Sequence, residues 1–387
     1  MNIINVSTIL PLENLKREND IVVRIQENLA RKYAYEFEIV KSLPYVNKFL
    51  SNINKKWKLY YKYQNEKIVS VSNFKTIIYP WISPPTSNFC FNCIFIPINF
   101  IFYKVFYKKL IIKNFNTADL ILAQNTIPDS LIAYWLSKDY NVPYILNIRG
   151  NFNTKIIDLP IFKKIYKNSF AVITHSPVNY KKLKTKIEIN LILHPIDEIF
   201  YDNSEKDFSF IRLVTVCRLI KLKNIDWVID ALSALNVKKC HFEYHIVGDG
   251  PELHSLMDKA KKFNLTDKIF FHGHKDRLFV ADILKKSHIF IMPSYPETLG
   301  RAFLEAAASG CLCIGHKNTG VDGFFTDHES GFFVTKESIS ARLEKIYVHF
   351  SKCFVESYTN KSKKMVENLT WEKICDEYNN LYLKSRS

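Results

Sequence analysis

Two carboxylates, Glu297 and Glu305, stand eight residues apart in a stretch whose pattern predicts a strand, a turn, a helix and a second strand. Residues 289–292 are apolar without alternation, as is typical of a strand in a parallel sheet covered on both faces. Strong helix formers follow from Arg301, and Gly310 stands where a left-handed residue would end the helix. The pattern therefore predicts a helix N-terminus at the carboxyl end of a parallel strand.

The predicted helix terminus suits an anion, because free backbone N–H groups and the positive end of the helix dipole converge there. If the helix starts near Leu299, Glu305 lies about 9 Å along it. The two carboxylates can then flank an extended ligand and accept hydrogen bonds from its hydroxyl groups. A nucleotide diphosphate-sugar has this shape, with phosphates between a ribose and a second sugar. The alternative is a surface helix with two solvated acids.

The stretch resembles the retaining glycosyltransferases of family 4, which share the two-domain GT-B fold. Their signature is a Glu-x7-Glu spacing after a Pro-Ser pair, with a glycine three residues past the first glutamate. The matching residues here are Pro293, Ser294, Glu297, Gly300 and Glu305. The resemblance extends upstream, in the family's order, through residues 214–232, 244–256 and 268–294. These pieces cover most of residues 208–335.

The resemblance implies an α/β GT-B fold of two Rossmann-like, doubly wound domains that face each other across a cleft. A chain of 387 residues fits two domains of ordinary size. We expect an acceptor-binding domain over residues 1–200 and a nucleotide-sugar-binding domain over residues 201–365. Residues 366–387 are expected to form a C-terminal helix that crosses back and packs on the first domain. The polar stretch 201–209 is the predicted linker.

Breaking a sugar–phosphate bond requires stabilisation of the negative charge that builds on the diphosphate, and cations with oriented amides do this best. The resemblance implies that Glu297 binds the donor sugar, Glu305 the ribose, and the loop 270–274 the base. The predicted catalytic residues are Arg218, Lys223, Glu297 and Arg149. The predicted donor-binding residues are Gly248, His272, Gly273, Thr298, Leu299, Gly300, Arg301 and Glu305. No Asp-x-Asp motif ends a predicted strand, so we expect no essential metal and no cofactor besides the nucleotide-sugar co-substrate.

The sequence departs from the family at two places. Residues 142–152 are predicted to form a strand and its outgoing loop, and Arg149 follows that strand, where many relatives carry a histidine beside the reacting sugar. A guanidinium cannot shuttle protons at neutral pH, but it can bind a phosphate or orient a hydroxyl. The loop 10–20 lacks the family's glycine-rich turn, although Lys16 or Arg17 could replace its phosphate contacts electrostatically.

Retention of the anomeric configuration is likewise implied by the resemblance. No second carboxylate pair suits a covalent glycosyl-enzyme route. A front-face displacement, in which the leaving phosphate takes the acceptor's proton, therefore fits better.

The positive charge is concentrated in the N-terminal part of the chain. The net charge is +16, and residues 41–120 hold 12 lysines but only two acids, Glu66 and Asp119. This excess indicates an anionic partner, either nucleic acid or an anionic membrane surface with a lipid-linked phosphate. Residues 89–115 combine aromatic and aliphatic side chains with lysines, and their apolar core is too short to span a membrane. They suit an interfacial segment on an anionic bilayer or, equally, a buried helix with a solvated lysine edge carrying Lys104, Lys108, Lys109 and Lys113.

The eight cysteines show no secreted-protein pattern, and the N-terminus lacks the features of a signal peptide. We expect a cytoplasmic protein, peripheral on the inner face of the plasma membrane. Cys90 and Cys93 form a lone C-x-x-C without a second ligand pair, so a zinc site is not expected. Most of the cysteines are interpreted as small core residues.

These observations predict a metal-independent, retaining hexosyltransferase that acts on a glycan or lipid-linked saccharide in the biosynthesis of a bacterial surface polysaccharide (capsule, O-antigen or lipopolysaccharide). The alternatives are a GT-B enzyme of other chemistry and a basic nucleic-acid-binding protein. A phosphorylase needs a pyridoxal-type lysine site, which the sequence does not offer, and a sugar-nucleotide epimerase needs an acid/base group where Arg149 stands. A nucleic-acid binder would leave the donor motifs without a purpose, so no nucleic-acid partner is predicted.

Overall fold

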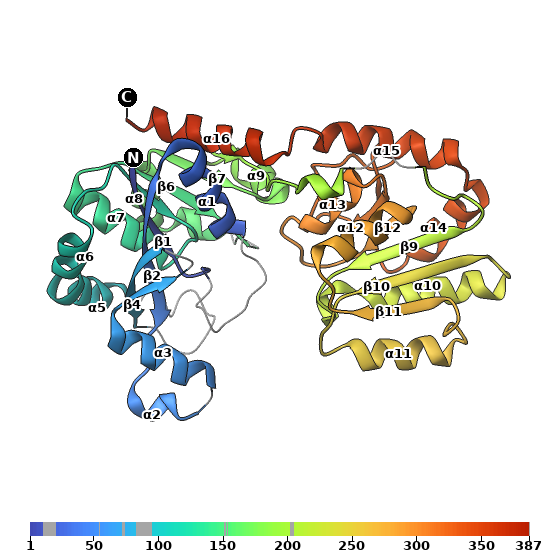
Figure 1. Cartoon of the computed structure of the whole chain (residues 1–387), viewed down its shortest axis with the longest axis horizontal. Coiled ribbons are helices and arrows are strands. Elements are labelled where there is room, and N and C mark those ends of the chain that lie inside the picture. Colours follow the sequence, from blue (N-terminus) through green and yellow to red (C-terminus); the bar gives the residue numbers. More distant parts are fainter. Residues whose placement is uncertain are drawn as a thin grey trace. The chain divides into compact units, whose positions relative to one another are not determined.

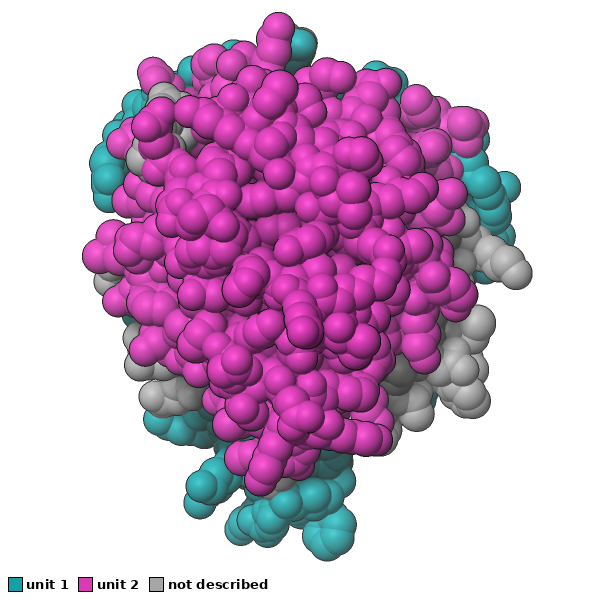
Figure 2. Space-filling view, turned by 90° about the vertical axis from the view of Figure 1, so that its right-hand side faces the viewer, with its two compact units in different colours: residues 1–174, 186–190, 375–387 teal, residues 175–185, 191–374 magenta. Residues whose placement is uncertain are grey.

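The computed structural model describes residues 1–10, 21–53, 55–71, 74–82, 95–150, 152, 154–201 and 205–386. The chain forms two compact units (Figure 1), which Figure 2 colours teal and magenta. Unit 1 comprises Met1–Thr174, Lys186–Asn190 and Cys375–Ser387. Unit 2 comprises His175–Thr185 and Leu191–Ile374.

An eight-stranded sheet, in the order β3-β4-β2-β1-β5-β6-β7-β8, forms the centre of unit 1. Its strands are β1 (Asn2–Ser7), β2 (Glu36–Pro44), β3 (Ile68–Val71), β4 (Phe74–Trp81), β5 (Leu120–Ala123), β6 (Tyr144–Ile148), β7 (Ala171–Thr174) and β8 (Asn190–Leu191). β3 pairs with β4 in the antiparallel sense, while the pairs from β4 through β2, β1, β5 and β6 to β7 are parallel. Strand order reverses between β1 and β5, which is where ligands bind in open parallel sheets.

The helices of unit 1 are arranged around this sheet, with α2 at the edge of the unit (Figure 1). They are α1 (Ile21–Tyr33), α2 (Lys48–Ser51), α3 (Lys55–Glu66), α5 (Ile96–Phe102), α6 (Lys108–Asn114), α7 (Asp129–Tyr140) and α8 (Pro160–Lys167), with the 3-10 helix η2 (Thr154–Asp158). A π-helical turn, η1 (Tyr103–Tyr107), joins α5 to α6. From residue 95 onward, the basic and aromatic segment 89–115 is therefore helical.

Unit 2 contains a six-stranded, wholly parallel sheet in the order β11-β10-β9-β12-β13-β14. Its strands are β9 (Ile211–Val216), β10 (Phe242–Val247), β11 (Ile269–Gly273), β12 (Ile289–Met292), β13 (Leu312–His316) and β14 (Phe332–Val334). All four residues of β12 are buried, as the uninterrupted apolar run predicted. The switch in strand order lies between β9 and β12.

The remaining helices are α9 (Pro177–Leu183), α10 (Ile225–Val237), α11 (Leu253–Lys262), α12 (Arg277–Lys286), α13 (Arg301–Ala308), α14 (Ile339–His349), α15 (Lys352–Val366) and α16 (Trp371–Lys384), with the 3-10 helices η3 (Glu198–Phe200) and η4 (Lys221–Lys223). The last helix, α16, begins in unit 2 and ends in unit 1. Its Trp371 donates to Asp197 in unit 2 at 2.6 Å, and its Asp376 pairs with Lys32 in unit 1 at 2.5 Å. This confirms the predicted C-terminal helix that returns to the first domain.

Among the residues that the structure describes, no helix is both long enough and apolar enough to cross a bilayer.

Candidate active site

The loops after β9, β10, β11 and β12 carry the residues predicted for the donor. These strands are parallel neighbours, so their carboxyl ends meet at one edge of the sheet. Gly248, after β10, packs closely: its φ is +136°, and a Cβ there would lie 1.8 Å from the Cys217 carbonyl oxygen. Its N–H donates to the carbonyl oxygen of Gly273 at 2.8 Å. Gly248 and Gly273 therefore hold the ends of two neighbouring strands together.

Lys223 and Glu297 form an ion pair at this edge. Lys223, in η4, places its Nζ 2.5 Å from Oε2 of Glu297, in the loop after β12. The Ser294 hydroxyl donates to the same oxygen at 3.0 Å, and the N–H of Thr298 donates to Oε1 at 3.0 Å. The Lys223 and Glu297 side chains are 19% and 15% exposed, so the oriented pair remains open to a ligand.

The N-terminus of α13 lies a few residues beyond Glu297. Gly300 is its N-cap, with a φ of +68°, and the helix begins at Arg301. The expected start near Leu299 is therefore wrong by two residues, because a left-handed residue cannot continue a right-handed helix. Glu305 consequently lies about 6 Å along the helix, not about 9 Å. The Phe303 N–H donates to the Gly300 carbonyl oxygen at 2.8 Å. The N–H groups at the very start of a helix lack an acceptor one turn back, so this terminus suits an anion.

Glu305 is buried between two arginines. It is 7% exposed, and its Oε1 lies 3.1 Å from Nη2 of Arg277 and 3.4 Å from Nη2 of Arg301. Arg277 also donates from Nε to Asp197 Oδ2 at 2.7 Å. Neither Arg277 nor Asp197 was predicted from the sequence to contact the site. Arg277 stands three residues after the 270–274 loop, and this position could have pointed to it as a donor-site residue. No feature of the sequence pointed to Asp197.

His272, at the end of β11, belongs to a row of polar side chains on the two neighbouring strands β11 and β10. Its Nε2 lies 2.9 Å from Nδ1 of His245, whose Nε2 lies 3.2 Å from Glu243 Oε2. Burial lowers the pKa of His272. Burial also lowers the pKa of His245, although the hydrogen bond to Glu243 acts in the opposite direction. Because both imidazoles favour the neutral form, one can donate to the other. This row was also missed from the sequence.

The other two predicted cations occupy different environments. Arg218, just after β9, is exposed, and its side chain makes no ion pair or hydrogen bond with a residue that the structure describes. Arg149 follows β6 in unit 1, and its Nη2 donates to Oε1 of Gln124 at 3.0 Å. Burial lowers the pKa of Arg149. The structure thus brings Lys223 and Glu297 into contact, while Arg149 belongs to the other unit.

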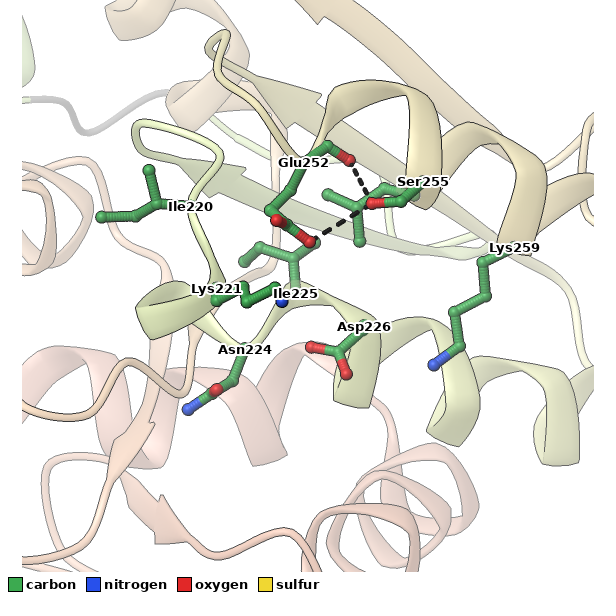
Figure 3. Close-up of a pocket in the computed structure, with 9 residues that line it drawn as sticks. Ile220, Lys221, Asn224, Ile225, Asp226, Glu252, Ser255 and Lys259 are labelled. Carbon is green, nitrogen blue, oxygen red and sulfur yellow. Dashed lines mark hydrogen bonds between the residues drawn. The ribbon is translucent and has the colours of Figure 1, made fainter.

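A pocket of about 370 Å³ opens between the N-terminal ends of α10 and α11 in unit 2. Figure 3 shows its polar lining, in which the Ser255 hydroxyl donates to the Glu252 carbonyl oxygen at 2.8 Å. Lys221, Asp226 and Lys259 contribute charges of both signs. None of the predicted catalytic or donor-binding residues lines this pocket.

Several expectations concern residues outside the described ranges, namely the loop from residue 11 to 20 with Lys16 and Arg17, and the pair Cys90 and Cys93. Of the described cysteines, the buried ones are Cys240, Cys311, Cys313 and Cys375, in line with core positions. Within the described part of the chain, no group of three or more His, Cys, Asp or Glu side chains could hold a metal ion.

Comparison with known proteins gives both a family match and a fold. Residues 200–353 match the family described as Glycosyl transferases group 1. The N-acetyl-alpha-D-glucosaminyl L-malate synthase of Bacillus anthracis is 23% identical over 234 residues, which make up 55% of this chain and 60% of that protein. The chain spans about half the length of the curated relatives it matches, from 40% to 60% for three of them.

Solved structures resemble the chain over nearly its whole length. A sucrose-phosphate synthase from Thermosynechococcus elongatus matches with a TM-score of 0.70 and 16% identity, over 99% of this chain and 98% of that chain. A protein from Anabaena, solved in complex with UDP and glucose, matches with a TM-score of 0.64 and 13% identity, over 99% and 100%. The two parallel-sheet units and these neighbours define a GT-B fold, as predicted from the sequence.

Proposed function

We propose that the protein is a retaining glycosyltransferase that moves a sugar from a nucleotide diphosphate-sugar to a hydroxyl group of a glycan or lipid-linked saccharide. The observation that carries this proposal is the oriented Lys223–Glu297 pair beside the N-terminus of α13, within the residues that match the glycosyltransferase family. The Anabaena neighbour solved with UDP and glucose supports a nucleotide-sugar donor.

In this proposal, the positive charges act on the leaving diphosphate. Arg218 is exposed and available to a phosphate, and the amides at the start of α13 add the positive end of a helix dipole. The Lys223 ammonium has three N–H donors, so it can bind a phosphate oxygen while it keeps its bond to Glu297. Such preorganised charge stabilises the transition state most where water is excluded. These cations would take the part that a divalent metal plays in other enzymes.

The carboxylates would orient the two sugars of the donor. Glu297 would accept hydrogen bonds from the transferred sugar, and Glu305 from the ribose. Arg277 and Arg301 hold the Glu305 carboxylate in place by charge-assisted contacts, which orients it to accept hydroxyl hydrogens. His272 and Gly273 would flank the base. The acceptor hydroxyl would attack from the face that the diphosphate leaves, and its proton would pass to the departing phosphate.

Unit 1 would bind the acceptor, with Arg149 orienting a hydroxyl or a phosphate. The exposed apolar side of α5 and η1 supports a lipid-linked acceptor and a peripheral position at the inner face of a bacterial plasma membrane. Its large side chains are 50% to 61% exposed: Ile98, Ile101, Val105 and Phe106. A bacterial surface polysaccharide is the product class that we propose.

The lysines of this segment do not act alike. Lys104 and Lys108 pair with Asp139 of α7 at 3.0 and 2.6 Å. Burial by itself would raise the pKa of Asp139, but the hydrogen bonds from Lys108, Tyr103 and Lys104 lower it overall. These two lysines therefore hold η1 and α6 against α7, which leaves the exposed Lys109 and Lys113 to meet an anionic surface.

Calorimetric titration with UDP, GDP and a panel of their sugar conjugates tests the donor proposal. We expect one nucleotide to bind with EDTA present, and one of its sugar conjugates to bind more tightly than the nucleotide alone. If no nucleoside diphosphate and no sugar conjugate binds, the proposed function is wrong.

A further inference from the structure

The most exposed large apolar side chain described in unit 1 lies on a small projection between β2 and α3. We call residues 45–53 and 55–58 the α2–α3 tip. Phe49 is 79% exposed and Ile53 is 59% exposed, with Tyr45 beside them at 48%. Figure 1 shows α2 and α3 at the edge of the unit, away from its central strands. Side chains of this size lose favourable free energy in water, so their exposure calls for a partner.

The tip also carries positive charge that no acidic residue close in the sequence balances. Its exposed lysines are Lys48, Lys55, Lys56 and Lys58. No acidic residue occurs between Glu38 and Glu66 in the sequence, and Glu66 already pairs with Lys62 at 3.6 Å. Among the residues described, none forms an ion pair with Lys48, Lys55 or Lys58. The tip therefore combines exposed apolar side chains with exposed lysines in one short segment.

The tip is held in place without help from these side chains. Gln64 accepts the Val46 N–H at 3.1 Å and donates to the Pro44 carbonyl oxygen at 2.6 Å. Asn47 caps α2 by accepting the Leu50 N–H at 2.8 Å. A buried cluster of Leu43, Tyr63 and Ile78 packs beneath. The exposed residues can thus be replaced with little effect on folding, and a structural role does not explain them.

We propose that the α2–α3 tip docks on the anionic surface of a lipid bilayer, with Phe49 and Ile53 inserted at the interface and the four lysines among the headgroups. Apolar side chains beside a basic cluster bind such surfaces by combining burial with charge attraction. The surface is independent of the transfer reaction proposed above, because it is argued only from contacts within unit 1. A single-stranded nucleic acid fits less well, since Ile53 offers no ring for a base to stack on.

Sedimentation with vesicles tests the proposal directly. The parent chain should pellet with vesicles of phosphatidylglycerol and phosphatidylcholine at low salt, and much less with phosphatidylcholine alone. Phe49→Ser/Ile53→Ser should weaken this binding about tenfold or more, because it removes the inserted apolar area. Replacing Lys48, Lys55 and Lys58 by Gln should weaken it by about a hundredfold, at about fivefold for each lysine.

Matched variants on unit 2 separate the tip from general surface effects. Val237→Ser removes an apolar side chain that is 84% exposed, and Lys361→Gln/Lys364→Gln removes two exposed lysines of α15. Both should bind vesicles as the parent does. Circular dichroism and thermal unfolding of each variant check that it remains folded.

Insertion has its own signature, which charge attraction alone would not give. Phe49→Trp places an indole at the tip, and its fluorescence should shift to shorter wavelength with anionic vesicles and be quenched by brominated lipid. Equal binding by the tip variants and the parent would overturn the proposal, as would an indole that neither shifts nor is quenched. Tip variants that lose affinity for single-stranded RNA but not for vesicles would instead assign the surface to nucleic acid. None of these measurements depends on transferase activity, so their failure leaves the proposed transfer reaction to its own test.

Discussion

At the scale of single residues, the account depends on side chains that are distant in the sequence and adjacent in the fold. Lys223 and Glu297 are separated by 74 positions, yet their charged atoms lie 2.5 Å apart. The sequence placed both residues at the donor through a family resemblance, but no spacing showed that they pair. Asp197 and Arg277 were missed for the same reason, because only the packing of α12 against η3 brings the start of α12 next to Asp197.

Replacing Lys223 tests the phosphate site. Lys223→Ala should weaken nucleoside diphosphate binding by about tenfold to a hundredfold, since a charge-assisted hydrogen bond in such a site contributes about 1.5–3 kcal/mol. Calorimetric titration measures the effect. Lys221→Ala is the matched control, because Lys221 is exposed in the same short helix η4 and is not predicted to touch the donor. Equal losses in the two variants would mean that charge in general, and not this position, matters.

Glu305 offers a second test. Glu305→Gln keeps the shape of the side chain but removes the charge that faces Arg277 and Arg301. We expect nucleoside binding to weaken about tenfold, as the amide is a poorer acceptor for ribose hydroxyls. The affinities of the variant for UDP and uracil, or for GDP and guanine, are then compared. A loss of affinity for the nucleotide but not for the free base assigns the effect to the ribose and phosphates. Unchanged affinity for the cognate nucleoside diphosphate would remove Glu305 from the donor site.

A buried histidine predicts how stability depends on pH. His288 is 1% exposed, its Nδ1 accepts the Arg212 N–H at 3.0 Å, and burial together with Lys206 lowers its pKa to about 4. Below about pH 6.5 the unfolded chain binds a proton at this imidazole, while the folded protein binds none until about pH 4. Folding stability should therefore fall by about 3 kcal/mol across this window through His288 alone.

Urea unfolding of the parent and of His288→Gln, at pH 7.5 and pH 4.5, measures this contribution. Carboxylates titrate in both proteins, so the difference between their pH dependences isolates the histidine. The variant should lose less stability on acidification than the parent. Parallel losses in the two proteins would show that His288 is protonated in the folded state as well.

At the scale of elements, the apolar pattern predicted the strands better than the helices. The buried runs at β6 and β12 were correctly placed, because a covered parallel strand needs uninterrupted apolar residues. The start of α13 was wrong by two residues, since the left-handed conformation of Gly300 depends on its tertiary contacts. The π-helical turn η1 left no signal in residues 103–107, whose composition suits an ordinary helix equally well.

Two helix ends in unit 2 share one cation. The Lys206 ammonium donates to the carbonyl oxygens of Leu284, Lys285, Ser287 and Ser309, at 2.6 to 3.2 Å. These groups close the C-terminal ends of α12 and α13, where carbonyls lack partners within the helix. Lys206→Met should lower the free energy of unfolding by about 2 kcal/mol, since bonds to charged groups contribute about 1.5–3 kcal/mol.

Lys286→Met is the control for this prediction. Lys286 forms an exposed pair with Asp282 within α12, and such pairs contribute less than about 1 kcal/mol. Urea unfolding of both variants gives the comparison. If Lys206→Met is as stable as Lys286→Met, water can replace the ammonium as the hydrogen-bond donor to the carbonyl groups at these helix ends.

At the scale of the whole molecule, the GT-B fold followed from the order of several motifs, whereas length only allowed two domains. The family match over residues 200–353 covers the unit whose motifs were recognised in the sequence. Unit 1 has no comparable motifs, so the residues that we propose to bind the acceptor were the least predictable. The composition of residues 41–120 predicted a basic and apolar surface. Only the fold distinguishes the lysines that pair with Asp139 from the lysines that remain exposed.

The most direct test of the central claim measures, by chromatography and with EDTA present, how fast nucleoside diphosphate is released from the nucleotide-sugar. The parent chain, supplied with its cognate donor and a mixture of lipid-linked and soluble saccharides, should release nucleoside diphosphate and form a glycosylated product. Lys223→Ala and Glu297→Gln should each slow this release about a hundredfold or more, while Lys221→Ala should not. Release that requires added magnesium or manganese, or that is unchanged in both site variants, would contradict the account.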